Sequence, residues 1–395
     1  MKQTAVVIIP TYNERENITT TIEALLAVFK TISDWKMFIL VVDDTSPDKT
    51  YEVVRQVAAK NKQVHLLLNK KKSGLGGAYL KGMEYAFGTL QADAVFEFDA
   101  DLSHDPQRIP AFLKQLHEGA DMVLGSRYIQ GGSIPSNWGA HRKLLSIGGN
   151  TLITVVLGNR SIRDWTTGYR ALTKDVYLAV EPHLHAEKFT GYTFQIGFLH
   201  TAIENGFRVV EVPIHFVDRA YGESKIGPEY ITNTLRYIVR VRASSLIKSR
   251  FFKFMVVGAI GAAVQLVSLQ VLRVVLPEFS LFHLDTYMLA SIVSIELAVL
   301  SNFILNNTWT FADRKLQVGE YVQKFFQFNM ASLGSIGVQL VIAFLGKTLI
   351  GLKHLFTVPL IGISVDTGLV FAVVGILVGM AWNFFAYTTF IWKKK

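Results

Sequence analysis

Hydrophobic and polar positions follow two different patterns along the chain. Up to about Arg250, short apolar runs alternate with charged segments, as is typical of a soluble domain. Beyond Phe251 the chain contains long, nearly uncharged stretches, which favour lipid because a soluble helix needs only one apolar stripe. The pattern predicts a soluble domain over residues 1–228, a linker over 229–250 and a membrane domain over 251–395, with four spans near 252–275, 287–308, 326–350 and 366–392.

Strand-like and helix-like segments alternate in the first domain. The predicted strands are Ala5–Ile9, Met37–Val42, Val64–Leu68, Ala94–Phe98 and Met122–Leu124, and the predicted helices include Tyr51–Ala59, Gly76–Gly88 and Pro106–Glu118. This alternation predicts an α/β fold, with a mostly parallel sheet wrapped by helices. Ligands of such sheets bind at the carboxyl ends of the strands.

Composition and charge indicate which kinds of partner the chain binds. The formal net charge is +9, and Lys and Arg gather beside the apolar stretches, which favours a membrane surface over nucleic acid. The absence of cysteine excludes disulfides and thiolate metal sites. In the linker, Ile231 and Leu235 alternate with Arg236 and Arg240, which predicts a basic amphipathic helix on the membrane surface.

Polar clusters follow four of the predicted strands, at Pro10–Glu14, Asp43–Asp48, Asp99–Asp101 and Gly125–Arg127. Each cluster is also ordinary turn chemistry, and taken singly each is as compatible with a structural role as with a functional one. Four carboxylate-rich or basic clusters at one edge of a sheet predict a site.

Asp99 and Asp101 predict a metal site. They are two residues apart at a strand end, so an extended backbone places both carboxylates on the same side. Two carboxylates repel unless a cation or proton lies between them, and oxygen-only ligands suit Mg²⁺ or Mn²⁺. The alternative is a helix cap for the segment that begins at Pro106, which Ser103 or Asp105 could provide without them.

These motifs resemble those of inverting GT-A-fold glycosyltransferases of family 2, and most of all the dolichyl-phosphate mannose synthases. The matching segments are PTYNE from Pro10, VVDDTSPDKT from Val41, FDADLSHDP from Phe98, GSRY from Gly125 and PIHFVDRAYGESKIG from Pro213. The resemblance covers essentially residues 4–228, and its most specific pieces are SPD and LSHDP.

The resemblance implies a role for each matching residue. The nucleotide would contact Pro10, Tyr12 and Glu14, with Val41 and Asp43 at its base. Asp99, Ala100 and Asp101 would hold the diphosphate through Mg²⁺ or Mn²⁺, with Asp101 the main ligand and Ser103 a further one. The residues implied around the phosphates of donor and acceptor are Arg127, Arg219 and Lys225, with Arg142 and Lys143 at the acceptor phosphate.

One position departs from the family pattern. Gly197 stands where relatives carry a carboxylate in GY-x-FQIE, which puts an acid role for that position in doubt. Asp164 is the nearest remaining candidate for orienting the sugar, and a turn cap that leads into a strand is an equal alternative. The catalytic group implied by the resemblance therefore comprises Asp101, Arg127, Asp164, Arg219 and Lys225.

The resemblance implies transfer of mannose from GDP-mannose to dolichyl or another polyprenyl phosphate, with inversion. An acceptor hydroxyl would need a base, whereas a lipid monophosphate, with a second pKa of about 6, is already largely dianionic. Two alternatives stay open: transfer of glucose from UDP-glucose to undecaprenyl phosphate, and a lipid-sugar flippase with an inactive transferase domain. The identity of the nucleotide's base remains open, because Asp43 can accept a hydrogen bond from uracil or guanine. The oligomeric state is open too.

The membrane domain contains an internal repeat. Phe254 and Gln265 recur in order as Phe328 and Gln339, and Asn302-Phe303 recurs as Asn383-Phe384, which predicts two related hairpins. The stretch resembles the four-helix GtrA-like membrane domains, which implies either transport of a lipid-linked sugar or a plain anchor.

Charged residues give the expected topology. Lys and Arg concentrate before the first span, between the second and third, and at the carboxyl terminus, so the catalytic domain and carboxyl terminus of this multi-pass protein are expected in the cytoplasm. Glu296 lies near the middle of a predicted span, where a charge costs roughly 2.5–3.5 kcal/mol. We expect its side chain to face the bundle interior, against Gln265 or Asn302.

Overall fold

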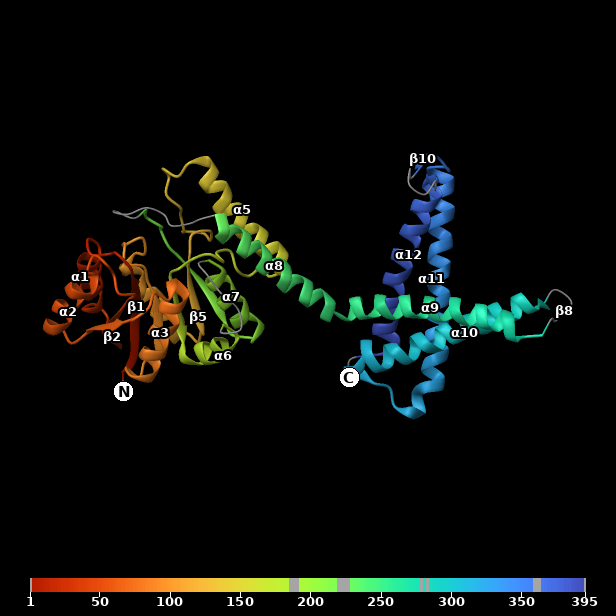
Figure 1. Cartoon of the computed structure of the whole chain (residues 1–395), viewed down its shortest axis with the longest axis horizontal. Helices are drawn as coiled ribbons and strands as arrows, with labels where there is room; N and C mark the ends of the chain where they lie inside the picture. The colour runs from red at the N-terminus through yellow and green to blue at the C-terminus, as the bar shows by residue number, and fades with distance from the viewer. Residues whose placement is uncertain are drawn as a thin grey trace. The chain divides into compact units, whose positions relative to one another are not determined.

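The structure is a computed structural model that describes residues 2–184, 192–218, 228–277, 280–281, 284–357 and 364–393. It divides into two compact units, Met1–Arg242 and Ala243–Lys395, which are considered separately (Figure 1). Two of the predicted site residues, Arg219 and Lys225, lie outside the described residues.

Among the described residues of the first unit, seven strands form one sheet (Figure 1). Its order is β3-β2-β1-β4-β6-β5-β7, and β6 runs antiparallel to both of its neighbours, whereas every other pair is parallel. The predicted α/β fold of GT-A type is confirmed, and β6 and β7 add to the predicted strands. The strands are β1 Gln3–Thr11, β2 Trp35–Asp43, β3 Val64–Leu68, β4 Ala94–Glu97, β5 Met122–Ser126, β6 Arg170–Thr173 and β7 Val209–Pro213.

The strand directions decide where the site can form. The strands β1, β2, β4 and β5 all point the same way, so their carboxyl ends share one edge of the sheet. Because β6 is antiparallel, its first residue reaches the same edge, where Arg170 is in register with Glu97 and Leu124. The polar clusters predicted from the sequence therefore follow strands that end together.

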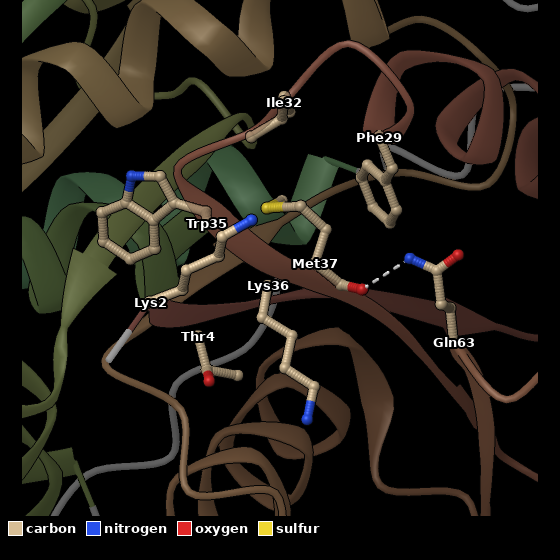
Figure 2. Close-up of a pocket in the computed structure, with 8 residues that line it drawn as sticks. All are labelled: Lys2, Thr4, Phe29, Ile32, Trp35, Lys36, Met37 and Gln63. Atoms are coloured by element: carbon tan, nitrogen blue, oxygen red, sulfur yellow. Dashed lines mark hydrogen bonds between the residues drawn. The ribbon is translucent and has the colours of Figure 1, made fainter.

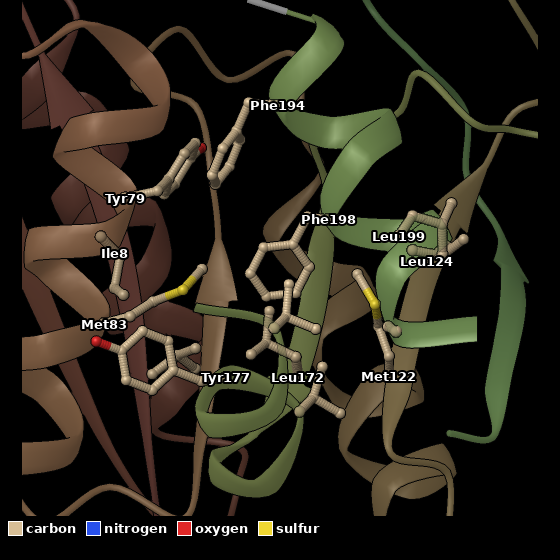
Figure 3. Packing of buried hydrophobic residues seen from close by; sticks show 14 of the residues in the cluster. Ile8, Tyr79, Met83, Met122, Leu124, Leu172, Tyr177, Phe194, Phe198 and Leu199 are labelled. Atoms are coloured by element: carbon tan, nitrogen blue, oxygen red, sulfur yellow. The ribbon is translucent and has the colours of Figure 1, made fainter. Parts of the chain in front are cut away.

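Helices cover both faces of the sheet, because alternate strand residues point to opposite sides. One core joins Val7, Ile39 and their neighbours to α1, α2 and α4, and the other joins Ile8, Leu172 and their neighbours to α3, α5, α6, α7 and α8 (Figure 3). The helices are α1 Ile18–Phe29, α2 Thr50–Lys60, α3 Gly74–Gly88, η1 Pro106–Arg108, α4 Ile109–His117, α5 Ala140–Leu157, α6 Lys174–Leu184, α7 Tyr192–Glu204 and α8 Pro228–Lys248.

The second unit is built from two helical hairpins, α9–α10 and α11–α12. Within its described residues, three segments are long and apolar enough to cross a membrane: Arg250–Leu272, Val318–Leu349 and Val373–Ile391. The predicted span near 287–308 coincides with α10, and the number of passes stays a prediction. The elements are α9 Arg250–Val275, β8 Ser280–Leu281, β9 Leu284–Asp285, α10 Thr286–Leu305, η2 Asn306–Thr310, η3 Ala312–Arg314, η4 Val318–Glu320, α11 Tyr321–Leu349, β10 His354–Thr357, β11 Ser364–Asp366, α12 Thr367–Ala386 and η5 Tyr387–Ile391.

Glu296 is exposed on α10, so the expectation that it faces the bundle interior was wrong. Among the described side chains of this helix, the buried ones include Ala290, Ser294 and Ala298, which recur every four residues along one stripe. Glu296 lies two residues from Ser294, and the helical repeat turns it to the opposite side.

The internal repeat is visible as two π-helical turns, η2 and η5, that follow the second helix of each hairpin. Each turn closes with the same five-residue hydrogen bond, from Phe311 N to Asn306 O and from Trp392 N to Tyr387 O, both 2.8 Å. The residues that follow the turns stack on each other, with the ring centroids of Phe311 and Trp392 4.7 Å apart. The two turns thus join the hairpins through one aromatic cluster.

Asn307 makes three hydrogen bonds, one of which links the first turn to Trp392, the residue after the second turn. Its Oδ1 accepts from Trp392 Nε1 and from Leu316 N, both at 3.0 Å, and its Nδ2 donates to Tyr321 OH at 3.1 Å. The Asn307 side chain is buried, so the donors it satisfies cannot easily turn to other partners.

Asn307→Ala should therefore lower the free energy of unfolding of the membrane unit by about 2 kcal/mol, the scale of leaving buried polar groups without partners. Thermal unfolding of the full chain in detergent, followed by tryptophan fluorescence, would measure the change. Thr308→Ala is the control, because Thr308 is exposed and its hydroxyl donates to Ile304 O, one turn earlier in the chain, at 2.8 Å. Equal unfolding midpoints for the two variants would contradict the role of Asn307.

Candidate functional site

The loops after β1 and β2 are held together by Asp43. Its fully buried carboxylate accepts from Thr11 Oγ1 at 2.7 Å, from Ser46 N at 2.8 Å and from Ser46 Oγ at 2.7 Å. These bonds direct the side chain into the loop, so recognition of the base by Asp43 stays a prediction. Val41 is also fully buried, and its side chain belongs to the core.

The other residues predicted at the nucleotide lie at the end of β1 and in the loop that follows it. Pro10, Tyr12 and Glu14 are half-buried, and Asn13 between them has a φ of 60°. The ammonium of Lys72, which precedes α3, lies 3.6 Å from the centre of the Tyr12 ring. This places an aromatic face and a cation together beside the carboxyl ends of β1 and β2.

Asp99 and Asp101 follow β4 at the same edge, and both are partly exposed. Asp99 Oδ1 accepts from Tyr79 OH at 3.4 Å, and Asp101 Oδ1 accepts from Ser103 N at 3.0 Å. The cap of the following helix is provided by Asp105, whose Oδ1 accepts from Gln107 N at 2.9 Å. Asp99 and Asp101 are therefore not needed as caps, and their oxygen-only donor set fits Mg²⁺ or Mn²⁺.

The remaining predicted residues of this loop are more deeply buried. Ala100 packs in the core and its carbonyl accepts from Thr21 Oγ1 at 2.6 Å. Ser103 is buried as well, and the contact that the structure shows for it is the backbone bond to Asp101. A metal contact from Ser103 stays a prediction.

Arg127 and Asp164 form one unit. Arg127 donates to Asp164 from Nη2 at 2.6 Å, from Nε at 2.7 Å and from its backbone N at 3.0 Å, and Nη2 also donates to Thr166 Oγ1 at 2.8 Å. The side chains are only 9% and 0% exposed. The resemblance implies phosphate contact for Arg127, and Asp164 is a candidate for the sugar or for a turn cap. The structure brings the two side chains together as a two-pronged ion pair.

The candidates for the acceptor phosphate lie at the start of α5. Arg142 stacks on Trp138 at 3.9 Å from the ring centre and donates to Asp218 Oδ1 at 3.1 Å, while Lys143 Nζ donates to Ser136 O at 2.8 Å. Trp138 Nε1 also donates to Asp218, at 3.0 Å. Asp218 thus ties this loop to the segment that precedes Arg219.

A shallow pocket lies at the opposite edge of the sheet, at the amino ends of β1 and β2 (Figure 2). Lys2, Trp35 and Lys36 line it together with apolar side chains. Ligands of parallel sheets bind at the carboxyl ends, so this pocket is not the candidate site.

Comparison with known proteins gives the family. Residues 6–178 match the family described as glycosyl transferase family 2, and residues 253–392 match the GtrA/DPMS transmembrane domain. The chain is 32% identical over 368 residues to a dolichol-phosphate mannosyltransferase of Pyrococcus furiosus, which covers 92% of this chain and 95% of the relative. The chain belongs to glycosyl transferase family 2.

Two further relatives match mainly the transferase domain. A polyprenol monophosphomannose synthase of Mycolicibacterium smegmatis is 40% identical over 234 residues, 59% of this chain and 84% of the relative. An undecaprenyl-phosphate mannosyltransferase of Micrococcus luteus is 38% identical over 243 residues, 60% of this chain and 96% of the relative. This family 2 member is therefore a glycosyltransferase with a membrane domain.

Sequence reasoning missed a buried ion pair beneath the site of this glycosyltransferase. Glu97 and Arg170 are both fully buried, with Arg170 Nε 3.9 Å from Glu97 Oε2. Burial raises the pKa of Glu97 to about 7, against the opposing effect of Arg170, and burial lowers the pKa of Arg170. A charged residue within a short buried strand was the available signal, because unpaired carboxylates are rarely buried.

Arg170 organises the loop that carries Asp164. Its guanidinium donates to three backbone carbonyls: Gln195 O at 2.7 Å, Thr167 O at 2.9 Å and Trp165 O at 3.2 Å. The loop is anchored again by Glu211, whose carboxylate accepts from Asp164 N at 2.9 Å. The Arg127–Asp164 pair is thus supported from both sides.

Proposed function

We propose that this glycosyltransferase transfers mannose from GDP-mannose to a polyprenyl phosphate, with inversion at the anomeric carbon. The observation that carries the proposal is the pair Asp99 and Asp101, at the sheet edge where β1, β2, β4 and β5 end, in a chain whose relatives bear mannosyltransferase names. The sugar, the donor and the acceptor rest on those relatives and on the sequence motifs.

Asp99 and Asp101 would hold a Mg²⁺ or Mn²⁺ ion, and the ion when bound would neutralise charge on the diphosphate. The chain itself must bring two anions together, the donor diphosphate and the acceptor phosphate. The proposed positive groups are Arg127, Arg142, Lys143, Arg219 and Lys225, and arginine suits the planar set of phosphate oxygens. No base is needed because the lipid phosphate is already ionised.

The exposed surfaces of α5 and α8 support an acceptor that lies in a membrane. On α5, Leu144 directly follows the basic residues Arg142 and Lys143 and is 73% exposed, and Val155 further along the helix is 70% exposed. On α8, Ile231, Leu235 and Val239 are exposed beside Arg236 and Arg240. Apolar residues next to basic ones on a helix fit the interface of an anionic bilayer.

The site is proposed to face the cytoplasm, where positive-inside logic places the loops rich in Lys and Arg. The carboxyl terminus is assigned to the same side, and the membrane domain is proposed to cross the bilayer four times. Accessibility of single introduced cysteines in intact cells would test this topology, since the natural chain has none.

Purified full chain incubated with Mn²⁺, dolichyl phosphate and labelled GDP-mannose should move label into the organic phase, and EDTA should abolish the transfer because the donor site is proposed to require a divalent ion. NMR of the product should show a β-linked mannosyl phosphate, and an α-linked product would contradict inversion. Transfer of glucose from UDP-glucose, without transfer from GDP-mannose, would overturn the assignment of GDP-mannose as the donor. Absence of transfer from every nucleotide-sugar tried, in a folded protein, would favour the flippase alternative.

A further inference from the structure

His104 lies beneath the candidate metal site and contacts Asp99 through both ring nitrogens. The backbone N–H of Asp99 donates to His104 Nδ1 at 3.1 Å, and His104 Nε2 lies 3.5 Å from Asp99 Oδ2. One imidazole therefore touches the backbone and the carboxylate of the same residue. The sequence motif FDADLSHDP contains this histidine, and the function proposed above leaves it without a role.

The hydrogen bonds fix the form of the ring. Because Nδ1 accepts a hydrogen bond, it carries no proton, and the proton of the neutral imidazole is on Nε2, where it faces the carboxylate. The His104 side chain is only 2% exposed, so the ring has little contact with water. A neutral ring adds no positive charge that would oppose a bound cation.

Aromatic packing fixes the position of the ring. His104 stacks on Tyr169, with centroids 4.8 Å apart and an angle of 12° between the planes, and meets the edge of Phe98 at 5.4 Å. Tyr169 in turn stacks on Phe112 at 4.5 Å and donates from its hydroxyl to Asp105 O at 3.1 Å. The imidazole is therefore held by the core of the sheet and by the helix that follows the metal motif.

The loop between Asp99 and His104 needs such support. Leu102 has a φ of 58°, a left-handed conformation that costs free energy for a residue with a branched side chain. Besides the bond from Ser103 N to Asp101, the loop is held at its start by the bond from Asp99 N to His104. Without that bond, the two carboxylates would be held together less firmly.

We infer that His104 is a positioning residue that fixes Asp99 for binding a divalent cation, through the acceptor nitrogen Nδ1 and with the ring held between Phe98 and Tyr169. The inference rests on the proposed function, since it gives a role to a residue behind the proposed metal site. It extends to Tyr79, whose buried hydroxyl bonds the other oxygen of Asp99. The Asp99 carboxylate thus lies between the Tyr79 hydroxyl, which donates to Oδ1 at 3.4 Å, and His104 Nε2, which lies 3.5 Å from Oδ2.

Two substitutions separate positioning from packing. His104→Phe keeps an aromatic ring for stacking on Tyr169 but removes the acceptor for Asp99 N–H. His104→Asn removes the ring but places Oδ1 close to where Nδ1 accepts. If His104 only fills space, the variant that unfolds at the lower temperature should also bind metal more weakly. If it positions Asp99, the order of metal affinity should be the reverse of the order of stability.

The experiment measures Mn²⁺ binding to the full chain in detergent with GDP present, by EPR of free Mn²⁺, alongside the unfolding temperature. His104→Phe should weaken Mn²⁺ binding about ten-fold or more, the usual scale for losing a partner of a metal ligand. His104→Asn should stay within about three-fold of the natural chain while unfolding at the lower temperature, because it loses ring packing. His117→Asn, at an exposed position of α4, is the control and should change neither quantity.

Unchanged Mn²⁺ binding by His104→Phe would overturn the inference, as would equal weakening in both His104 variants or absence of Mn²⁺ binding by the natural chain. Failure of the proposed function gives a different result, because it would show as missing mannose transfer with normal Mn²⁺ binding. The readout for His104 depends on neither the sugar nor the lipid acceptor.

Discussion

Replacing Asp101 with asparagine should reduce mannose transfer by roughly three orders of magnitude, the upper scale for removing one electrostatic contact to a transition state. The amide has the size of the carboxylate and lacks its negative charge. Its Oδ1 can still accept from Ser103 N, the bond that the carboxylate makes at 3.0 Å, so the loop should keep its shape. The loss would then report on the bound cation and not on folding.

The measurement is the initial rate of label transfer at saturating GDP-mannose, together with Mn²⁺ affinity and the unfolding temperature. Asp105→Asn is the matched control, because Asp105 lies in the same loop and its Oδ1 caps the next helix by accepting from Gln107 N. Asparagine caps helices about as well as aspartate, so this control should keep nearly full activity. If the Asp101→Asn variant retained a tenth of the activity, this result would contradict the assignment of Asp101 as the main metal ligand.

The central sheet could be predicted from the sequence because its strands are short and apolar and alternate with helical segments. Ala5–Ile9 and Met37–Val42 lie within the observed β1 and β2, and parallel pairing then places their ends at one edge. The antiparallel β6 has only four residues and begins with Arg170, so the sequence contains no apolar run from which this strand could be predicted. Its position between β4 and β5 depends on pairing with segments that are distant in the sequence, and a local pattern of apolar and polar residues holds no information on that pairing.

The candidate site could be predicted as a set of residues but not as a set of contacts. The clusters at Asp43, Asp99 and Asp101 follow strands that end together, and this follows from strand direction. By contrast, the pairing of Arg127 with Asp164 joins the end of β5 to the loop before β6. It depends on the tertiary fold, as do the burial of Glu97 against Arg170 and the tautomer of His104.

In the membrane unit too, the sequence pattern predicts the elements but not their contacts. The repeat of Asn302-Phe303 as Asn383-Phe384 could be found in the sequence, and each pair precedes a π-helical turn. Which face of α10 is buried could not be decided from the presence of a charge. A buried stripe is set by neighbouring helices, and it includes the small residues Ala290, Ser294 and Ala298 here, with Glu296 on the other side.

Asp164→Asn should both destabilise the transferase domain and reduce its activity. The carboxylate accepts three hydrogen bonds from Arg127, with side chains 9% and 0% exposed, so the substitution leaves a nearly buried guanidinium without its counter-charge. Breaking a buried ion pair from one side costs about 3–5 kcal/mol. Thermal and urea unfolding of the full chain, monitored through the transferase domain, would measure it.

Asp218→Asn is the matched control for stability, because it makes the same chemical change in the Arg142–Asp218 pair, where the side chains are 44% and 33% exposed. Exposed pairs contribute about 0–1 kcal/mol, so this variant should unfold close to the natural chain. The activity of Asp164→Asn should fall even below its unfolding temperature, since Arg127 is proposed to act at the phosphates and would lose its fixed position. Equal stability of the two variants would show that Arg127 finds another partner, and the ion pair would then not be what holds this side of the site.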